Sequence, residues 1–296
     1  MRKSLYVRRV SRATYLRRLL LEQYVLRRLG RSARRRALPR IAIIAHDHIG
    51  DSIVIDGRYE GDILDVIMEW FLPRAVPRHE TTLALDVGAN IGNHTLAFAP
   101  RFAAVHAFEP NPIALHLLRA NVEMNGFANV QIHSVGLGRE DARLAYAPLA
   151  DNLGGGRFLD RGGDARSARE LEVRNGDAFW RQCEDPRRIG LVKVDVEGME
   201  SRVFEGLAAV LQEHHPMVLF EALTASACEE STAVLRLLGY THFFTIERWE
   251  SATLPTAMRV VLRLIRGADV LVRRLEDSPG GSHGMVVAVA RDLEIV

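Results

Sequence analysis

The sequence contains few cysteines and few lysines. Its two cysteines, Cys183 and Cys228, have the spacing of neither a metal-ligand motif nor a redox motif, which favours a reducing compartment, and we expect a cytoplasmic protein. Of its 39 basic residues, only Lys3 and Lys193 are lysines. This bias indicates an arginine-rich source composition, in which a single internal lysine is a candidate functional residue.

Long apolar runs are also absent from the N-terminal segment, where none exceeds three residues. This excludes a membrane span within the segment and does not fit the apolar core of a secretory signal. The 296 residues are 48 % apolar and 26 % charged, which is typical of a globular chain with one large domain or a domain plus an appendage.

The net charge of +2 conceals an asymmetry along the chain. Residues 1–40 contain 14 of the 39 bases and one acid, Glu22, so this segment carries +13 and the remainder carries −11. We interpret residues 1–40 as a basic arm, with an amphipathic helix over 11–30 and a linker over 30–40, that contacts an anionic membrane surface or an acidic partner. The alternative is a solvated tail. The acidic body argues against nucleic acid as the main partner.

Residues 41–80 are predicted to form a unit that caps the core. Two β-rich runs over 41–57, around a turn at 49–51, predict a hairpin. The run over 62–72 has helical periodicity and is expected to end at Pro73.

Residues 81–296 alternate strand and helix patterns, which predicts an α/β fold with a mostly parallel sheet. Two segments interrupt the alternation, a glycine-rich loop over 138–170 and an irregular, then helical, insertion over 249–281, and we expect both to shape a substrate pocket. The expected strands are 82–88, 105–109, 129–135, 191–198, 217–222, 240–247 and 284–290.

A nucleoside cofactor is indicated by residues at the ends of the first two of these strands. Asp86 ends a buried strand, Gly88 and Gly92 bracket a tight turn into a helix, and Glu109 ends the next strand, where it could accept hydrogen bonds from ribose hydroxyls. A dinucleotide site would need a middle glycine where Asn90 stands. Because Asp86 would repel phosphate but suits an ammonium group, S-adenosylmethionine fits better. The alternative for the two glycines alone is a plain strand-to-helix turn.

Three charged residues follow one another at strand spacing on a later strand. Lys193, Asp195 and Glu197 are expected to share one face, which is costly unless they pair or meet a ligand. One reading is a Lys193–Asp195 ion pair. The other is that Asp195 acts as general base for an attacking hydroxyl while Lys193 holds the carboxylate or the substrate oxygen.

Glu221 ends the next strand. It would bind substrate hydroxyls or serve as a structural cap. Together with Asp195 it could also bind a divalent metal, which we do not favour because no third ligand is evident. Of the histidines, only His94 is expected near the cofactor.

The motifs DVGANIG, FEPNP and LVKVDVEGMESRVFEG, in this order and spacing, resemble those of the FkbM-type family of class I S-adenosylmethionine-dependent methyltransferases. The resemblance covers residues 56–290. It implies a Rossmann-like fold with a seven-stranded sheet, and methyl transfer to a hydroxyl of a sugar, glycan or secondary metabolite.

The resemblance also implies roles for individual residues. Tyr59 and Glu60 would close over the cofactor, unless they form a helix cap. The sequence has no acid at the end of its third strand, where many class I enzymes place one for the adenine amine. The implied cofactor contacts are Asp86, Gly88, Asn90 and Gly92 at the methionine end, Glu109 at the ribose, and Asn111 with the backbone of 135–138, including Gly136, at the adenine.

Two other functions remain open from the sequence. The basic arm could tether a nucleic-acid methyltransferase, although the Asn/Asp-Pro-Pro-Tyr/Phe signature of amino methylation is absent. The chain could also be a non-catalytic binding protein that retains the fold.

Overall fold

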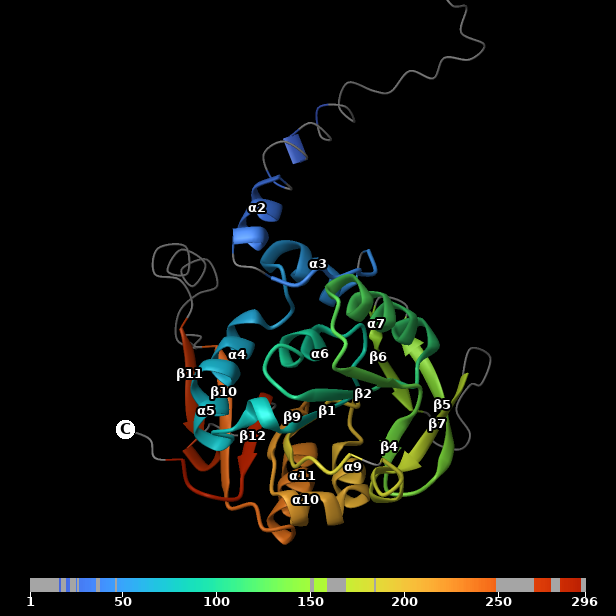
Figure 1. The fold of residues 1–296 in the computed structure, drawn as a ribbon, viewed down its shortest axis with the longest axis vertical. Coiled ribbons are helices and arrows are strands. Elements are labelled where there is room, and N and C mark those ends of the chain that lie inside the picture. The colour runs from blue at the N-terminus through green and yellow to red at the C-terminus, as the bar shows by residue number, and fades with distance from the viewer. Residues whose placement is uncertain are drawn as a thin grey trace, which may run out of the picture.

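A computed structural model describes residues 16, 20, 21, 25, 27–35, 38–45, 47–149, 152–158, 169–183, 185–248, 269–277 and 283–293. Its centre is an eight-stranded sheet in the order β11-β10-β12-β9-β8-β1-β2-β3 (Figure 1). The pairs among β3, β2, β1, β8 and β9 are parallel, and β12, β10 and β11 add antiparallel pairs at one side. The strands are β1 (Leu83–Val87), β2 (Ala104–Phe108), β3 (Val130–His133), β8 (Ile189–Val194), β9 (Met217–Ala222), β10 (His242–Arg248), β11 (Val270–Arg274) and β12 (His283–Val289).

Helices cover both faces of this sheet, as the continuous burial of its central strands requires. Leu83, Leu85 and Val87 of β1 pack in one cluster with α9 to α11, whereas Ala84 packs with α4 to α6 on the opposite face. In Figure 1, α6 and α7 lie above the sheet and α9 to α11 below it. The helices are α4 (Gly61–Val66), α5 (Leu72–Ala75), α6 (Asn93–Phe98), α7 (Pro112–Asn125), α8 (Gly176–Trp180), α9 (Glu200–Gly206), α10 (Ala208–His214) and α11 (Ala225–Leu237).

The Rossmann-like arrangement expected from the sequence is confirmed, and all seven expected strands are present. The eighth strand, β11, occupies part of the insertion for which we expected a helix, so that expectation is wrong over Val270–Arg274. Val270 and Val272 alternate onto the core and pair with β10, which stabilises a strand rather than a helix. The rest of that insertion, 249–268, lies outside the described residues.

A second sheet replaces part of the loop expected over 138–170. Its order is β4-β7-β5-β6, and it stands at the right of Figure 1. Buried side chains at alternate positions, Leu171 and Val173, together with Tyr146, explain why these segments pair as strands. The strands are β4 (Gly136–Gly138), β5 (Ala142–Leu149), β6 (Asn152–Phe158) and β7 (Arg169–Asn175).

The hairpin expected over 41–57 is also wrong, because His48–Asp56 forms helix α3. The Asp47 side chain accepts a hydrogen bond from the Ile49 amide at 2.8 Å, and Gly57 ends the helix with φ +85°. These caps, with Ile53 buried beneath the helix, outweigh the β-propensity of the branched residues.

Two other helices extend beyond their expected ends. The helix expected to stop at Pro73 continues to Ala75, because a π-helical turn, η2 (Ile67–Phe71), precedes the proline and α5 restarts with it in its first turn. Helix α2 (Arg27–Arg35) runs into the segment expected to be a linker.

The basic arm is described only in part. Four of its apolar side chains, at Leu16, Leu20, Leu21 and Val25, are exposed, and α2 projects from the body in Figure 1. Most of the amphipathic helix expected over 11–30 lies outside the described residues. Over the parts of the chain that are described, none of the helices has both the length and the apolar character needed to cross a bilayer.

Candidate functional site

The turn after β1 forms the floor of the site. Gly88, Asn90 and Gly92 all have positive φ, of +76°, +49° and +94°. A Cβ atom at Gly88 would collide with the Asp195 carbonyl oxygen, so this glycine lets two strand ends meet closely. The turn therefore holds the segment that begins at Gly88 directly against Asp195.

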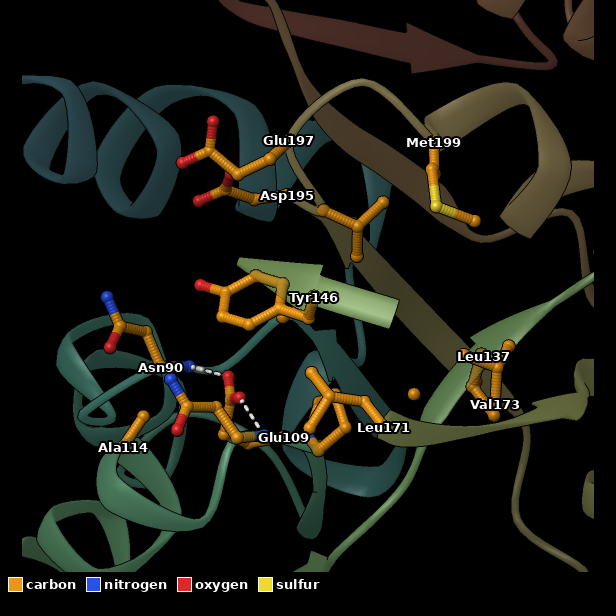
Figure 2. A pocket seen from close by; sticks show the side chains of 15 residues that line it. Asn90, Glu109, Ala114, Leu137, Tyr146, Leu171, Val173, Asp195, Glu197 and Met199 are labelled. Carbon is orange, nitrogen blue, oxygen red and sulfur yellow. Dashed lines mark hydrogen bonds between the residues drawn. The ribbon is translucent and has the colours of Figure 1, made fainter. Parts of the chain in front are cut away.

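Glu109 lies at the carboxyl end of β2 and is fixed by backbone amides. The amide of Asn90 donates to Oε2 at 2.8 Å and the amide of Asn111 donates to Oε1 at 2.7 Å (Figure 2). Burial raises the pKa of Glu109 to about 7, although these two hydrogen bonds oppose the shift. Among the described residues each carboxylate oxygen accepts one of these hydrogen bonds and keeps a lone pair beside a cavity, so a ligand hydroxyl could donate to either.

Lys193 is a buried cation that joins three parts of the site. It lies opposite Asp86 in the β1–β8 register, and both residues are at most 1 % exposed. Its Nζ lies 3.2 Å from Asp86 Oδ1 and 3.4 Å from Asp195 Oδ2, and donates to the Gly88 carbonyl at 2.9 Å. Burial alone would lower the pKa of Lys193, but the two carboxylates outweigh it and hold the pKa above its ordinary value. The ion pair with Asp195 that the sequence suggested is therefore present, and it includes Asp86.

Two adjoining cavities open at this edge of the sheet. They contain about 640 and about 850 Å³ of space between atoms, a volume that includes space open to solvent. The residues common to both are Gly88, Asn90, Glu109, Asp195 and Glu197. Most of the residues predicted from the sequence thus lie around one continuous space.

The first cavity is largely apolar. Gly136 lines it as expected, and Asn111 lines it too, although the Asn111 side chain accepts a hydrogen bond from the Ile113 amide at the start of α7. Sequence reasoning missed Tyr146, Leu171 and Val173, which belong to the second sheet and face the cavity in Figure 2. Leu171 and Val173 are apolar residues at alternate positions, which could have indicated a strand with one buried face.

The second cavity has an acidic wall, by which we mean Glu60, Asp195, Glu197 and Glu221. Burial, followed by the charge of Asp195, raises the pKa of Glu221 to about 8 and those of Glu60 and Glu197 to about 7. Glu221 is also hydrogen-bonded to Asp195. The wall therefore holds protons near neutral pH that ordinary carboxyl groups would have lost.

Glu60 reaches this wall from the N-terminal segment. Asn93 clamps the preceding residue, since its side chain accepts from the Tyr59 amide and donates to the Tyr59 carbonyl, both at 3.0 Å. Glu60 has φ +52° and stands at the N-cap position of α4, yet within the described chain its side chain makes no capping hydrogen bond. This favours a role in the cavity over the cap that we considered. Sequence reasoning did not identify Asn93.

His94 lies behind Glu60, with Nε2 3.7 Å from Glu60 Oε2. Burial and the charge of Lys193 lower the pKa of His94 to about 4, so the imidazole is neutral. Its Nε2 is buried without a hydrogen-bond partner among the described residues. Among all the described residues, no group of three or more His, Cys, Asp or Glu side chains is arranged so that it could hold a metal ion.

Comparisons with known proteins identify related methyltransferases. Residues 86–245, more than half of the chain, match the model of the Methyltransferase FkbM domain. Methyltransferase 1 of Beauveria bassiana is 29 % identical over 44 % of this chain and 60 % of its own length. The hexuronic acid methyltransferase AglP of Haloferax volcanii is 28 % identical over 53 % of this chain and 60 % of its own.

Among solved structures, methyltransferase FkbM from Methylobacillus flagellatus KT is similar with a TM-score of 0.39 and 18 % identity, over 58 % of this chain and 41 % of that one. The present chain spans about 60 % of the length of the two curated relatives. On the match to the family model, the chain belongs to the FkbM methyltransferase family.

Proposed function

We propose that this protein transfers the methyl group of S-adenosylmethionine to a hydroxyl of a sugar, glycan or related small metabolite. The observation that carries the proposal is the pair of cavities that meet at Gly88, Glu109 and Asp195, one apolar and one lined by carboxyl groups. The similarity to AglP, a hexuronic acid methyltransferase, supports a sugar acceptor.

The first cavity would hold the adenosine. Glu109 would accept the ribose hydroxyls through its free lone pairs, and Leu137, Leu171 and Val173 would contact the adenine. The methionine end would follow the turn from Gly88 towards the acidic wall, where carboxylates suit its ammonium and sulfonium groups.

Bound there, S-adenosylmethionine supplies an electrophilic methyl group on sulfur. Asp195 would take the proton of the acceptor hydroxyl, whose oxygen would receive the methyl group as sulfur leaves. Lys193 acts as a positioning residue, because its contact with Asp195 Oδ2 fixes the carboxylate while the contact with Gly88 fixes the turn.

Replacing Glu109 with alanine is expected to weaken binding of S-adenosylmethionine at least tenfold. Each hydrogen bond to a charged group contributes about 1.5–3 kcal/mol, and the substitution removes those to the ribose. Isothermal titration calorimetry measures the affinity, with Glu123→Ala, an exposed change on α7, as the matched control. If wild-type protein does not bind the cofactor, or Glu109→Ala binds it equally well, the proposal fails.

Affinity for S-adenosylmethionine should increase as the pH rises from about 6 to 8. Glu60, Glu109, Glu197 and Glu221 have raised pKa values of about 7 to 8, so they lose protons across this range, and their ionised forms attract the sulfonium. S-adenosylhomocysteine lacks that charge and should show a shallower dependence. Calorimetry of both ligands at several pH values tests this, and equal slopes would contradict it.

A further inference from the structure

Exposed apolar side chains gather at one end of the molecule. Ten large apolar side chains are exposed in the described chain, and eight of them lie on the basic arm, on α3 or on α7. In Figure 1 these three parts lie at the same end of the molecule, from which α2 projects. The eight are Leu16, Leu20, Leu21, Val25, Val54, Ile55, Ile113 and Met124. Such a concentration is typical of a contact surface, whereas single exposed apolar residues need no partner.

The basic arm combines its apolar side chains with positive charge. Arg27, Arg28 and Arg31 of α2 are exposed, and within the described part of the chain none of them pairs with a carboxylate. The arm has 14 bases and a single acid, Glu22. Helical segments with leucines and unpaired arginines are typical of the interface between water and an anionic bilayer.

Two asparagines of α7 fix the arm to the body. The side-chain amide of Asn125 accepts from the Arg40 amide at 2.9 Å and donates to the Arg40 carbonyl at 2.7 Å. Asn121 makes the same pair of bonds with Ala42, at 2.6 and 3.1 Å. It also donates to the Ile91 carbonyl, in the turn after β1, at 2.8 Å. The arm therefore leaves the body at a defined point beside the turn that forms the floor of the site.

The chain that follows this attachment runs along the second cavity. It contributes four residues to the lining of that cavity, His48, Ile49, Tyr59 and Glu60. Between them, α3 buries Ile53 against the body and exposes its neighbours Val54 and Ile55. The exposed apolar side of α3 and one wall of the cavity thus belong to the same short stretch of chain.

We propose that the arm and the outer side of α3 form a docking surface for an anionic lipid bilayer, which the protein contacts peripherally beside its second cavity. Lipid phosphates pair with the arginines while the leucines reach the edge of the acyl region. Asp51 and Asp56 are exposed on α3, so this helix adds apolar contact and no positive charge. The inference does not depend on the chemistry of the site.

A second copy of the chain fits this surface less well. Its body would attract the arm, because residues 41–296 carry −11. However, away from the surface itself only Leu223 and Leu237 are exposed large apolar residues of the described body, so it offers little for the leucines of the arm to contact. An anionic bilayer satisfies both the charge and the apolar side chains.

Sedimentation of the full-length protein with lipid vesicles tests the inference. The vesicles contain either phosphatidylcholine alone or phosphatidylcholine with about one quarter phosphatidylglycerol. We expect at least tenfold stronger partitioning to the anionic vesicles, and a loss of at least threefold when about 0.5 M salt screens the headgroups. Absence of a preference for the anionic vesicles, or a preference that salt leaves unchanged, would overturn the inference.

Variants of the full-length protein show whether this surface makes the contact. Leu20→Ser with Val25→Ser should reduce partitioning to anionic vesicles at least fivefold, and so should Arg27→Gln with Arg28→Gln. Ile55→Ser on α3 should reduce it at least twofold. Circular dichroism establishes that each variant is folded. Partitioning that survives both double substitutions of the arm would reject the bilayer as its partner.

Matched controls lie on the side of the sheet that α9 to α11 cover. Leu237→Ser removes an apolar side chain that is 84 % exposed, more than any on the arm, and Arg181→Gln with Arg202→Gln removes two exposed charges. Both should leave partitioning unchanged, and an equal loss in these controls would count against the surface. Sedimentation without lipid covers the other occupant. An oligomer that the arm variants dissociate, in a protein that does not bind vesicles, would assign the surface to a second copy and overturn the inference.

Discussion

Asp195→Asn is expected to slow methyl transfer in a single turnover by about 100- to 10,000-fold, the range of a lost general base. Asparagine has nearly the same shape and can still accept a hydrogen bond from Lys193 through its amide oxygen, but it cannot take a proton at neutral pH. The measurement is rapid-quench transfer of a labelled methyl group to an acceptor that the wild-type protein methylates.

Cofactor binding separates loss of the base from loss of the site. Affinity for S-adenosylhomocysteine should change by less than about threefold in Asp195→Asn, since its neutral sulfur does not depend on this charge. Asp292→Asn, an exposed change of the same kind, is the matched control. A rate for Asp195→Asn close to that of wild type would reject the assignment of Asp195 as base.

Lys193→Met is expected to lower the free energy of unfolding by about 3–5 kcal/mol. Removing one partner of a buried ion pair leaves the other charge uncompensated, and Asp86 is fully buried beside Lys193. The Thr95 hydroxyl, which donates to Asp86 at 2.5 Å, compensates only part of that cost. Urea unfolding followed by circular dichroism measures the change.

A double variant shows whether the buried charge is the cause. Adding Asp86→Asn to Lys193→Met removes the stranded carboxylate and should restore at least 1 kcal/mol, within the range of couplings between contacting residues. The ion pair is not what stabilises this part of the sheet if Lys193→Met alone lowers the free energy of unfolding by less than about 1 kcal/mol. The same holds if the losses from the two single substitutions simply add in the double variant.

The core of the fold could be predicted because its signals are local. Each central strand is a short buried run bounded by a turn, and the carboxyl ends of parallel strands meet at one edge of the sheet. This is why Asp86, Glu109 and Asp195, which are far apart in the sequence, could be expected in one site. In the structure, Glu109 accepts a hydrogen bond from the turn after β1, and Asp86 and Asp195 form ion pairs with Lys193. All three therefore lie in one site.

The second sheet could not be predicted, because it depends on contacts between segments that are distant in the sequence. Strand β5 pairs with β7 across a long separation in sequence, and nothing within either segment shows its partner, so Tyr146 could not be assigned to the cavity. Over 41–57 the error was different. The caps at Asp47 and Gly57 are visible in the sequence, but the β-branched residues between them were given more weight.

The clamp of Asn93 on Tyr59 has a consequence for how such sites diversify. Glu60 precedes the region shared with the family model, which begins at residue 86, although it lies in the same cavity as Asp195. On the proposed function, residues 86–245 would carry the cofactor contacts and three of the four residues of the acidic wall, and the preceding segment would add the fourth, Glu60. Exchange of that segment alone would then retain the site of the methyl donor and alter one side of the space for the acceptor.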